Sequence, residues 1–104
     1  MNKKYRLKYL PMFERDLSQA ASYISETLHN LESALKLIDE TEKAIIKRSE
    51  LPKAFEPLYS SKPRKNPYYK ISVGNFYVLY VVIDDVMEVR RFIYNRRNID
   101  SILP

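Results

Sequence analysis

The sequence predicts an α+β fold in which a helical hairpin packs on one face of a small, mainly antiparallel, twisted sheet. Two observations predict it. The period of the apolar residues changes from two to three or four after the first ten positions, and strand-like apolar runs return after residue 67. The 104 residues are 45% apolar, which is enough for one core but not for two. We therefore expect a single domain spanning residues 1–104.

The first half of the chain predicts one strand and two helices. Apolar and basic residues alternate over positions 5–9, which indicates a short strand that the Leu10-Pro11 step ends. Helical spacing follows over 12–28, and a break is expected at His29-Asn30 because asparagine tolerates left-handed backbone. A second helix is predicted from residue 31 until Leu51-Pro52. Its expected buried stripe is Leu31, Ala34, Leu35, Ile38, Ile45 and Ile46.

The second half predicts a loop and a three-stranded meander. Residues 52–67 hold four of the six prolines, which is typical of a surface loop. Strands are expected over 68–73, 76–83 and 86–94, and the Gly74-Asn75 pair between the first two is a strong hairpin signal. The complete element order is then β-α-α-β-β-β, with a last short helical turn near the C-terminus.

Basic charge gathers in this second half. The net charge is +1 over residues 1–52 and +4 over residues 53–104. No acidic residue interrupts the run from Val89 to Ile99, which indicates an anionic partner such as a phosphate backbone or an acidic protein segment. The run contains four arginines within eight residues, namely Arg90, Arg91, Arg96 and Arg97.

The side-chain alternation of the last strand assigns these residues to faces. Met87, Val89 and Ile93 are expected to face the helices. Arg90 and Tyr94 are expected to lie together on the opposite face, which we predict to be partly open. A sheet would then present its arginines to a ligand.

Several kinds of site lack their residues. The chain has no cysteine, one histidine and one glycine, so zinc centres, nucleophile–histidine pairs and glycine-rich phosphate loops are excluded. A hairpin turn explains Asp84-Asp85, and we expect neither a metal nor a cofactor. No signal peptide or membrane span is readable, so we expect a cytoplasmic protein without a membrane partner.

A basic and aromatic set remains as the candidate site. RNA cleavage needs no metal when the 2′-hydroxyl attacks its own adjacent phosphate, and Arg, Lys and Tyr can orient, stabilise and protonate the reacting groups. The candidates for this chemistry are Tyr94, Arg96 and Arg97, and those for nucleic-acid binding are Arg64, Lys65, Lys70, Arg90 and Arg91.

Two segments resemble a known family. The run YKISVGNFYVLY at 69–80 and the ending FIYNRRNID at 92–100 are similar to the signatures of RelE/ParE toxins from bacterial type II toxin–antitoxin modules. The element order is similar as well, and the resemblance covers nearly the whole chain. It implies a plasmid stabilisation protein-like toxin that a cognate antitoxin neutralises, with an acidic or amphipathic helix or an added strand.

The resemblance leaves the target open. RelE-like members cut mRNA on the ribosome, whereas ParE-like members poison DNA gyrase and are not known as hydrolases. The nucleases commonly carry an arginine where this chain has Tyr77, and a Tyr or His near the C-terminus, for which Tyr94 and Arg96 are the available substitutes. The first expectation is metal-independent mRNA cleavage. The alternatives are gyrase inhibition and an inactive, toxin-like binding module.

Overall fold

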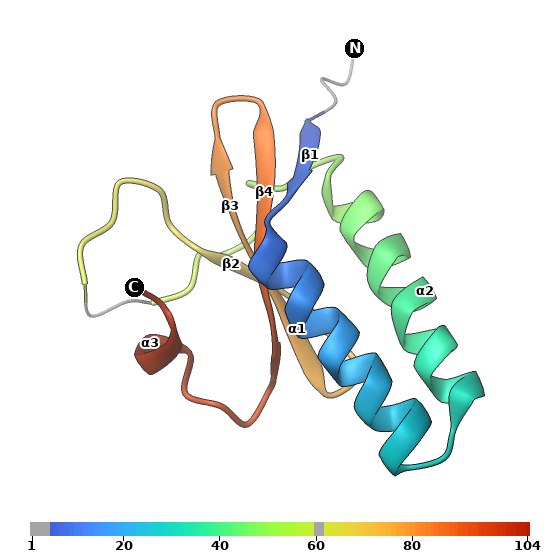
Figure 1. Ribbon diagram of the computed structural model, residues 1–104. Coiled ribbons are helices and arrows are strands. Elements are labelled where there is room, and N and C mark those ends of the chain that lie inside the picture. The colour runs from blue at the N-terminus through green and yellow to red at the C-terminus, as the bar shows by residue number, and fades with distance from the viewer. Residues whose placement is uncertain (1–4, 60–61) are drawn as a thin grey trace.

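The structure is a computed structural model that describes residues 5–59 and 62–104 (Figure 1). It confirms the α+β class and the predicted order of elements. A five-residue π-helical segment, η1, extends the first helix, and a short helix, α3, follows the last strand. The elements are β1 (Arg6–Tyr9), α1 (Pro11–Ser22), η1 (Tyr23–Thr27), α2 (Leu31–Arg48), β2 (Tyr69–Val73), β3 (Phe76–Ile83), β4 (Val86–Tyr94) and α3 (Ile99–Ile102).

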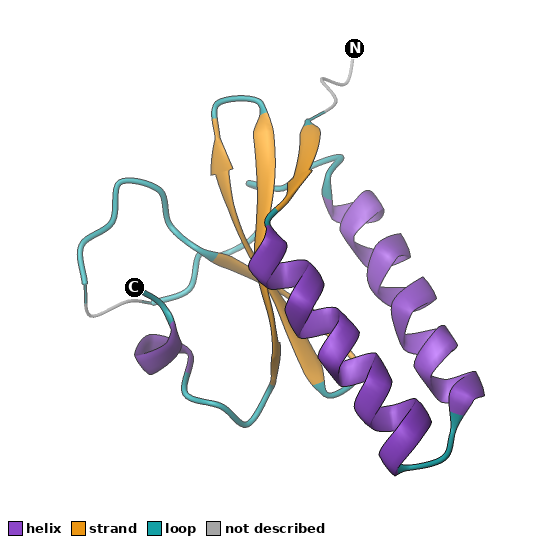
Figure 2. Cartoon of the chain, viewed as in Figure 1, coloured by secondary structure: helices purple, strands orange, loops and turns teal. Residues whose placement is uncertain are grey.

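The four strands form one sheet in the order β1-β4-β3-β2. β1 runs parallel to β4, and the remaining neighbours are antiparallel. The hairpin of α1 and α2 covers one face of the sheet, while α3 and the long loop before β2 lie on the other side (Figures 1 and 2). The second face is therefore covered in part, and it stays open at β2, where Lys70 and Ser72 are exposed, in line with the expectation of a partly open face. Its buried residues are Tyr68, Leu79, Val81, Ile93 and Leu103, against which Leu58, Ile99 and Ile102 pack.

The buried stripe of α2 differs from the predicted one. Leu31, Leu35 and Ile46 are exposed. The helix turns a stripe that includes a threonine toward the sheet, because the Thr41 hydroxyl donates a hydrogen bond to the Leu37 carbonyl (2.7 Å) and is thereby satisfied inside the core. The buried residues of α2 are Ala34, Leu37, Thr41 and Ile45.

The junction between the helices lies where it was expected, but its residues have different roles. The left-handed conformation was expected at Asn30. It occurs instead at His29, whose φ is 53°. Asn30 instead begins α2, because its side-chain oxygen accepts a hydrogen bond from the Ser33 N–H (3.0 Å).

A β-bulge in β4 exchanges the faces of the sheet on which the side chains of its second half lie. Leu79 pairs with Arg91 and Tyr80 pairs with Val89, so Arg90 has no partner on β3. Met87 and Val89 face the helices, as predicted. After the bulge Phe92 faces the helices, whereas Ile93 belongs to the opposite cluster, so the predicted face of Ile93 is wrong. Simple alternation could not include the extra residue.

The end of α2 is tied to the sheet through Arg48 and Tyr80. The Arg48 guanidinium donates to the Tyr80 hydroxyl (2.9 Å) and to the Lys70 carbonyl (3.1 Å), and lies 3.5 Å from the centre of the Phe55 ring. The Tyr80 hydroxyl donates to the Pro52 carbonyl (2.8 Å). Burial raises the pKa of Tyr80, although the Arg48 hydrogen bond opposes this shift.

We expect the substitution Tyr80→Phe to lower the free energy of unfolding by about 2 kcal/mol, because Pro52 loses a buried partner and Arg48 loses an acceptor. Tyr69→Phe is the matched control, because Tyr69 stacks on Tyr80 at 5.3 Å and its hydroxyl has no hydrogen bond within the described chain. It should change stability by less than about 0.5 kcal/mol. Urea unfolding of both variants measures the difference, and equal losses would contradict the role of the Tyr80 hydroxyl.

Candidate functional site

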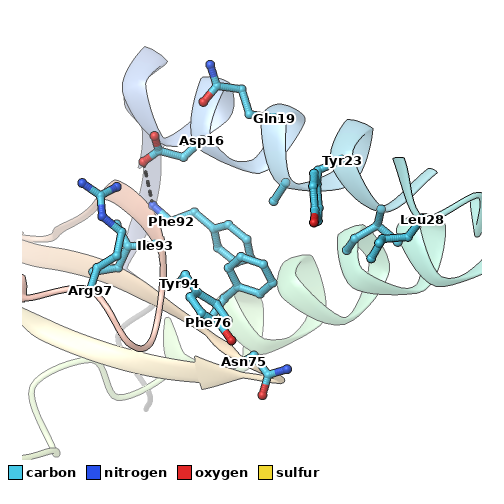
Figure 3. Close-up of a pocket in the computed structure, with 12 residues that line it drawn as sticks. Asp16, Gln19, Tyr23, Leu28, Asn75, Phe76, Phe92, Ile93, Tyr94 and Arg97 are labelled. Atoms are coloured by element: carbon cyan, nitrogen blue, oxygen red, sulfur yellow. Dashed lines mark hydrogen bonds between the residues drawn. The ribbon is translucent and has the colours of Figure 1, made fainter. Parts of the chain in front are cut away.

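A cavity of about 650 Å³ lies between α1, η1 and the ends of β3 and β4. It opens beside the basic C-terminal segment. Figure 3 shows polar side chains around the aromatic rings of the two strands, with Tyr23 and Leu28 on the helical side. The polar residues that line it are Asp16, Gln19, Asn75 and Arg97, and the aromatic ones are Tyr23, Phe76, Phe92 and Tyr94.

Three stacked or edge-on rings form the strand side of this cavity. Phe76 and Phe92 are stacked, with ring centres 4.7 Å apart, and Tyr94 meets Phe76 edge-on at 5.8 Å. The β-bulge makes this arrangement possible, because it turns Phe92 and Tyr94 toward α1. Tyr94 is 42% exposed, so its ring lies at the mouth and is available to a ligand.

Asp16 joins α1 to β4 at the wall of the cavity. Its carboxylate accepts hydrogen bonds from Arg91 Nε (2.7 Å) and Arg91 Nη2 (3.3 Å). It also accepts one from the Phe92 backbone N–H (3.0 Å), which Figure 3 shows as a dashed line. The side chains of Asp16 and Arg91 are only 11% and 23% exposed. Arg91 is one of the predicted nucleic-acid-binding residues, and in the structure its charge is paired with Asp16.

Arg90 lies on the opposite face of the sheet from Tyr94. Its guanidinium donates to Glu88 (2.7 Å) and to the Tyr68 hydroxyl (2.9 Å). Burial lowers the pKa of Arg90, but the hydrogen bonds with Tyr68 and Glu88 more than offset this, so its pKa is raised. Arg64 also lies near the Tyr68 ring, at 5.2 Å, and donates to the Pro104 carbonyl (2.8 Å). The predicted pairing of Arg90 with Tyr94 on one face is therefore wrong.

The remaining candidates divide between the two faces. Arg97 lines the cavity with Tyr94, and Arg96 is its exposed chain neighbour. Neither arginine has an ion pair within residues 5–59 and 62–104. Lys70 lies 4.4 Å from the centre of the Tyr77 ring, on the face away from the helices, and Lys65 is exposed in the long loop. The structure thus brings together Tyr94 and Arg97, with Arg96 beside them.

Sequence reasoning missed Asp16, Gln19, Tyr23 and Asn75. Asp16 had a readable signal, because it lies one turn from both Phe13 and Ala20 and so interrupts the apolar stripe of the first helix. A carboxylate at such a position requires a partner. The other three residues have no comparable signal, since polar and aromatic residues are common on exposed helices and in turns.

Two structural tests concern other kinds of site. In the described parts of the chain, no three carboxylate or histidine side chains gather closely enough to hold a metal ion. None of the helices described has both the length and the apolar character needed to cross a bilayer.

Comparisons with known proteins identify relatives of this chain. The family model described as the ParE toxin of type II toxin–antitoxin system, parDE, matches residues 7–99. A structure of the chromosomal ParDE system from P. aeruginosa superposes with a TM-score of 0.73 at 15% identity, covering 88% of this chain and 97% of that one. An archaeal RelE–RelB complex from Pyrococcus horikoshii superposes with a TM-score of 0.45 at 18% identity. The match covers 91% of this chain and 99% of that one. No curated protein matches.

We expect Asp16→Asn to destabilise the protein by about 2 kcal/mol, because it removes the charge opposite a largely buried guanidinium. Asp39→Asn is the control, since the Asp39–Lys43 pair is exposed to solvent and its loss should change stability far less than the loss of the Asp16 charge. Combining Asp16→Asn with Arg91→Gln should cost less than the two single changes added together. Thermal unfolding of Asp16→Asn, Arg91→Gln, their combination and Asp39→Asn checks this. Additive losses of stability in the double variant would show that Asp16 and Arg91 are not coupled.

Proposed function

Because this chain belongs to the ParE toxin family of type II toxin–antitoxin systems, we propose that it arrests growth by inhibiting DNA gyrase without hydrolysing a substrate. One observation supports this choice over RNA cleavage. Arg90 and Arg91, half of the C-terminal arginine cluster, form ion pairs within the fold, Arg90 with Glu88 and Arg91 with Asp16. The site of action that we propose is the cytoplasm, with residues 1–104 acting as one toxin domain.

Cleavage of RNA requires several groups to converge on one phosphate. A base must orient the 2′-hydroxyl, a cation must stabilise the added charge, and an acid must protonate the leaving oxygen. Among the described residues that line the cavity, Tyr23, Tyr94 and Arg97 carry the phenol and guanidinium groups left for such roles, because the Asp16 carboxylate already accepts three hydrogen bonds. Tyr77, at the place where the nucleases commonly carry an arginine, lies in the opposite cluster.

Inhibition of an enzyme by binding makes smaller demands on this surface. It requires a complementary contact and no proton transfer. Exposed Arg96 and Arg97 beside the Tyr94 ring combine the residue types that are enriched at the centres of protein interfaces. The same arginines suit a gyrase surface that is acidic or that carries DNA.

Cleavage of mRNA on the ribosome remains the second candidate, and one observation favours it. The exposed Tyr94 ring and the Arg97 guanidinium line the same cavity, so a base could stack where a phosphate is held. In either case the partner that we propose is a cognate antitoxin. Its acidic residues would cover the cationic surface of a chain whose net charge is +5.

We expect induction of the chain without an antitoxin to arrest growth, and the purified protein to inhibit DNA supercoiling by gyrase. Replacing both Arg96 and Arg97 by alanine should reduce inhibition by about tenfold or more, because two unpaired guanidinium groups leave the proposed contact. Arg15→Ala is the control, as it removes another exposed arginine from α1. Normal growth with folded, soluble wild-type protein present would contradict the toxin proposal.

We expect Tyr94→Phe to leave toxicity within about twofold of the wild type, because phenylalanine keeps the packing on Phe76 and binding alone needs no hydroxyl. If Tyr94 takes part in proton transfer, the same change should lower activity by about a hundredfold or more. Mapping of transcript ends after induction, together with the supercoiling assay, separates the two targets. If transcripts are cut and the cutting depends on the Tyr94 hydroxyl, the gyrase proposal is contradicted and the protein is an mRNA-cleaving toxin.

A further inference from the structure

The outward side of α2 carries apolar residues that the core does not use. Helical spacing brings them onto one side of the helix, beside the buried residues that face the sheet. Leu31, Leu35 and Ile46 are 64%, 58% and 58% exposed, and Ile38 is half-buried beside them. We call these four residues the α2 stripe. Large apolar side chains gathered in this way mark a surface that binds another protein.

A groove of about 400 Å³ separates the α2 stripe from the first helix. Its α2 wall consists of large side chains, whereas small residues make up most of the wall from α1 and η1. Small residues leave room for bulky side chains from a partner helix, as in the interdigitated packing of helical bundles. The small residues of this wall are Ser18, Ala21, Ser22 and Ser25.

The charges beside the α2 stripe are arranged symmetrically along the helix. Glu32 lies as far before the Leu37–Ile38 peptide bond as Lys43 lies after it. Lys36 and Asp39 are likewise equally far from that bond. At about 100° per residue, all four lie on the same flank of the stripe. If two copies of α2 pack antiparallel about this point, each acid on the flank faces a base of the other copy.

Antiparallel packing is the arrangement that these charges favour. Parallel packing about a two-fold axis would bring each residue near its own counterpart, and Glu32 would then repel Glu32 of the second copy. The ion pairs within one helix, Lys36–Glu40 and Lys43–Asp39, are exposed to solvent. They therefore hold the two lysines only weakly, and both lysines can bridge to a second helix.

The net charge of α2 favours a second copy over other partners. The helix has four acidic and four basic residues, so it is neutral in a chain whose net charge is +5. A neutral helix does not attract nucleic acid, and it lets two basic chains approach along a surface without net charge. Glu42 lies on the side of the stripe as well. Antiparallel packing places it against the first turn of the other α2, where the helix dipole stabilises an anion.

We propose that two copies of this chain associate through their α2 stripes, packed antiparallel about a two-fold axis at the Leu37–Ile38 bond. Leu35 and Ile38 meet near the axis, and the Leu31 end of each stripe lies against the Ile46 end of the other. An 18-residue helix is about 27 Å long, so the contact is small and a dissociation constant on the order of 10 µM is expected.

The proposed interface leaves the candidate functional site free. Ser18 and Ser25 line the groove beside the α2 stripe, whereas Gln19 and Tyr23 line the cavity between α1 and β4. These pairs lie on different sides of the first helix. The C-terminal helix α3 lies on the other side of the sheet from the hairpin (Figure 1). A dimer therefore presents two cavity mouths, and this inference needs neither gyrase nor an antitoxin.

The oligomeric state of the purified full chain tests the inference. Sedimentation velocity should show a monomer at about 1 µM and mostly dimer at about 300 µM. Glu32→Lys and Lys43→Glu each set like charges against one another on both sides of the axis, so each variant should dimerise at least about tenfold more weakly. An equimolar mixture of the two variants should recover the wild-type affinity, because each acid at these positions then faces a base.

Several outcomes contradict this interface. A wild-type chain that stays monomeric over the whole concentration range overturns the inference. A mixture of the two charge variants that dimerises no better than either variant alone overturns it as well, and so do single variants that dimerise like the wild type. If the chain is monomeric and NMR shifts of the α2 amides appear only when the product of the adjacent antitoxin gene is added, the stripe binds a different protein.

A substitution in the α2 stripe provides the apolar arm. Leu35→Lys puts a charge near the axis at a side chain that is already 58% exposed, so the melting temperature should stay near that of the wild type. Dimerisation should weaken by about tenfold or more. Leu51→Lys is the matched control, because Leu51 is 65% exposed and follows the end of α2. Its dimerisation should stay within about twofold of the wild type, and equal losses in the two variants overturn the inference.

Discussion

Arg90 occupies the one position of β4 that has no partner on β3. Because of this extra residue, each later side chain of the strand lies on the face of the sheet opposite to the one that simple alternation predicts. Phe92 and Tyr94 consequently turn toward α1, where they form a cavity with Phe76. Ile93 turns the other way and receives the C-terminal segment. The cavity, the aromatic stack and the position of the free arginines all depend on this single insertion.

The bulge also determines which arginines remain available. It places Arg90 against Tyr68 and Glu88 and lets Arg91 reach Asp16 of α1. Both charges are then compensated within the fold, so the electrostatic attraction for an anionic partner falls to Arg96 and Arg97 beyond the strand. A cluster that is uniform in sequence thus has a structural half and an exposed half.

The sequence was sufficient for the elements and their order, because these follow from local periodicity and turn residues such as Gly74-Asn75. It was insufficient to predict which side chains of β4 and α2 point into the core. A bulge leaves no trace in a run such as VMEVRRFIY, and the burial of Thr41 in place of Leu35 depends on a hydrogen bond to Leu37. The pairing of Asp16 with Arg91 joins positions 75 apart, so neither residue alone indicated the other. The covering of the second face by Leu58 and Leu103 is likewise non-local.

The parallel pairing of β1 with β4 links the two ends of the chain. Arg6 and Asp85, which form an ion pair at this contact, are 79 positions apart. Contacts of such separation form late, because loop closure must precede them. During translation β1 therefore cannot pair with β4 until nearly the whole chain has left the ribosome. A product cut short before β4 would lack the arginines, the support beneath α1 and the partner of its own first strand at once.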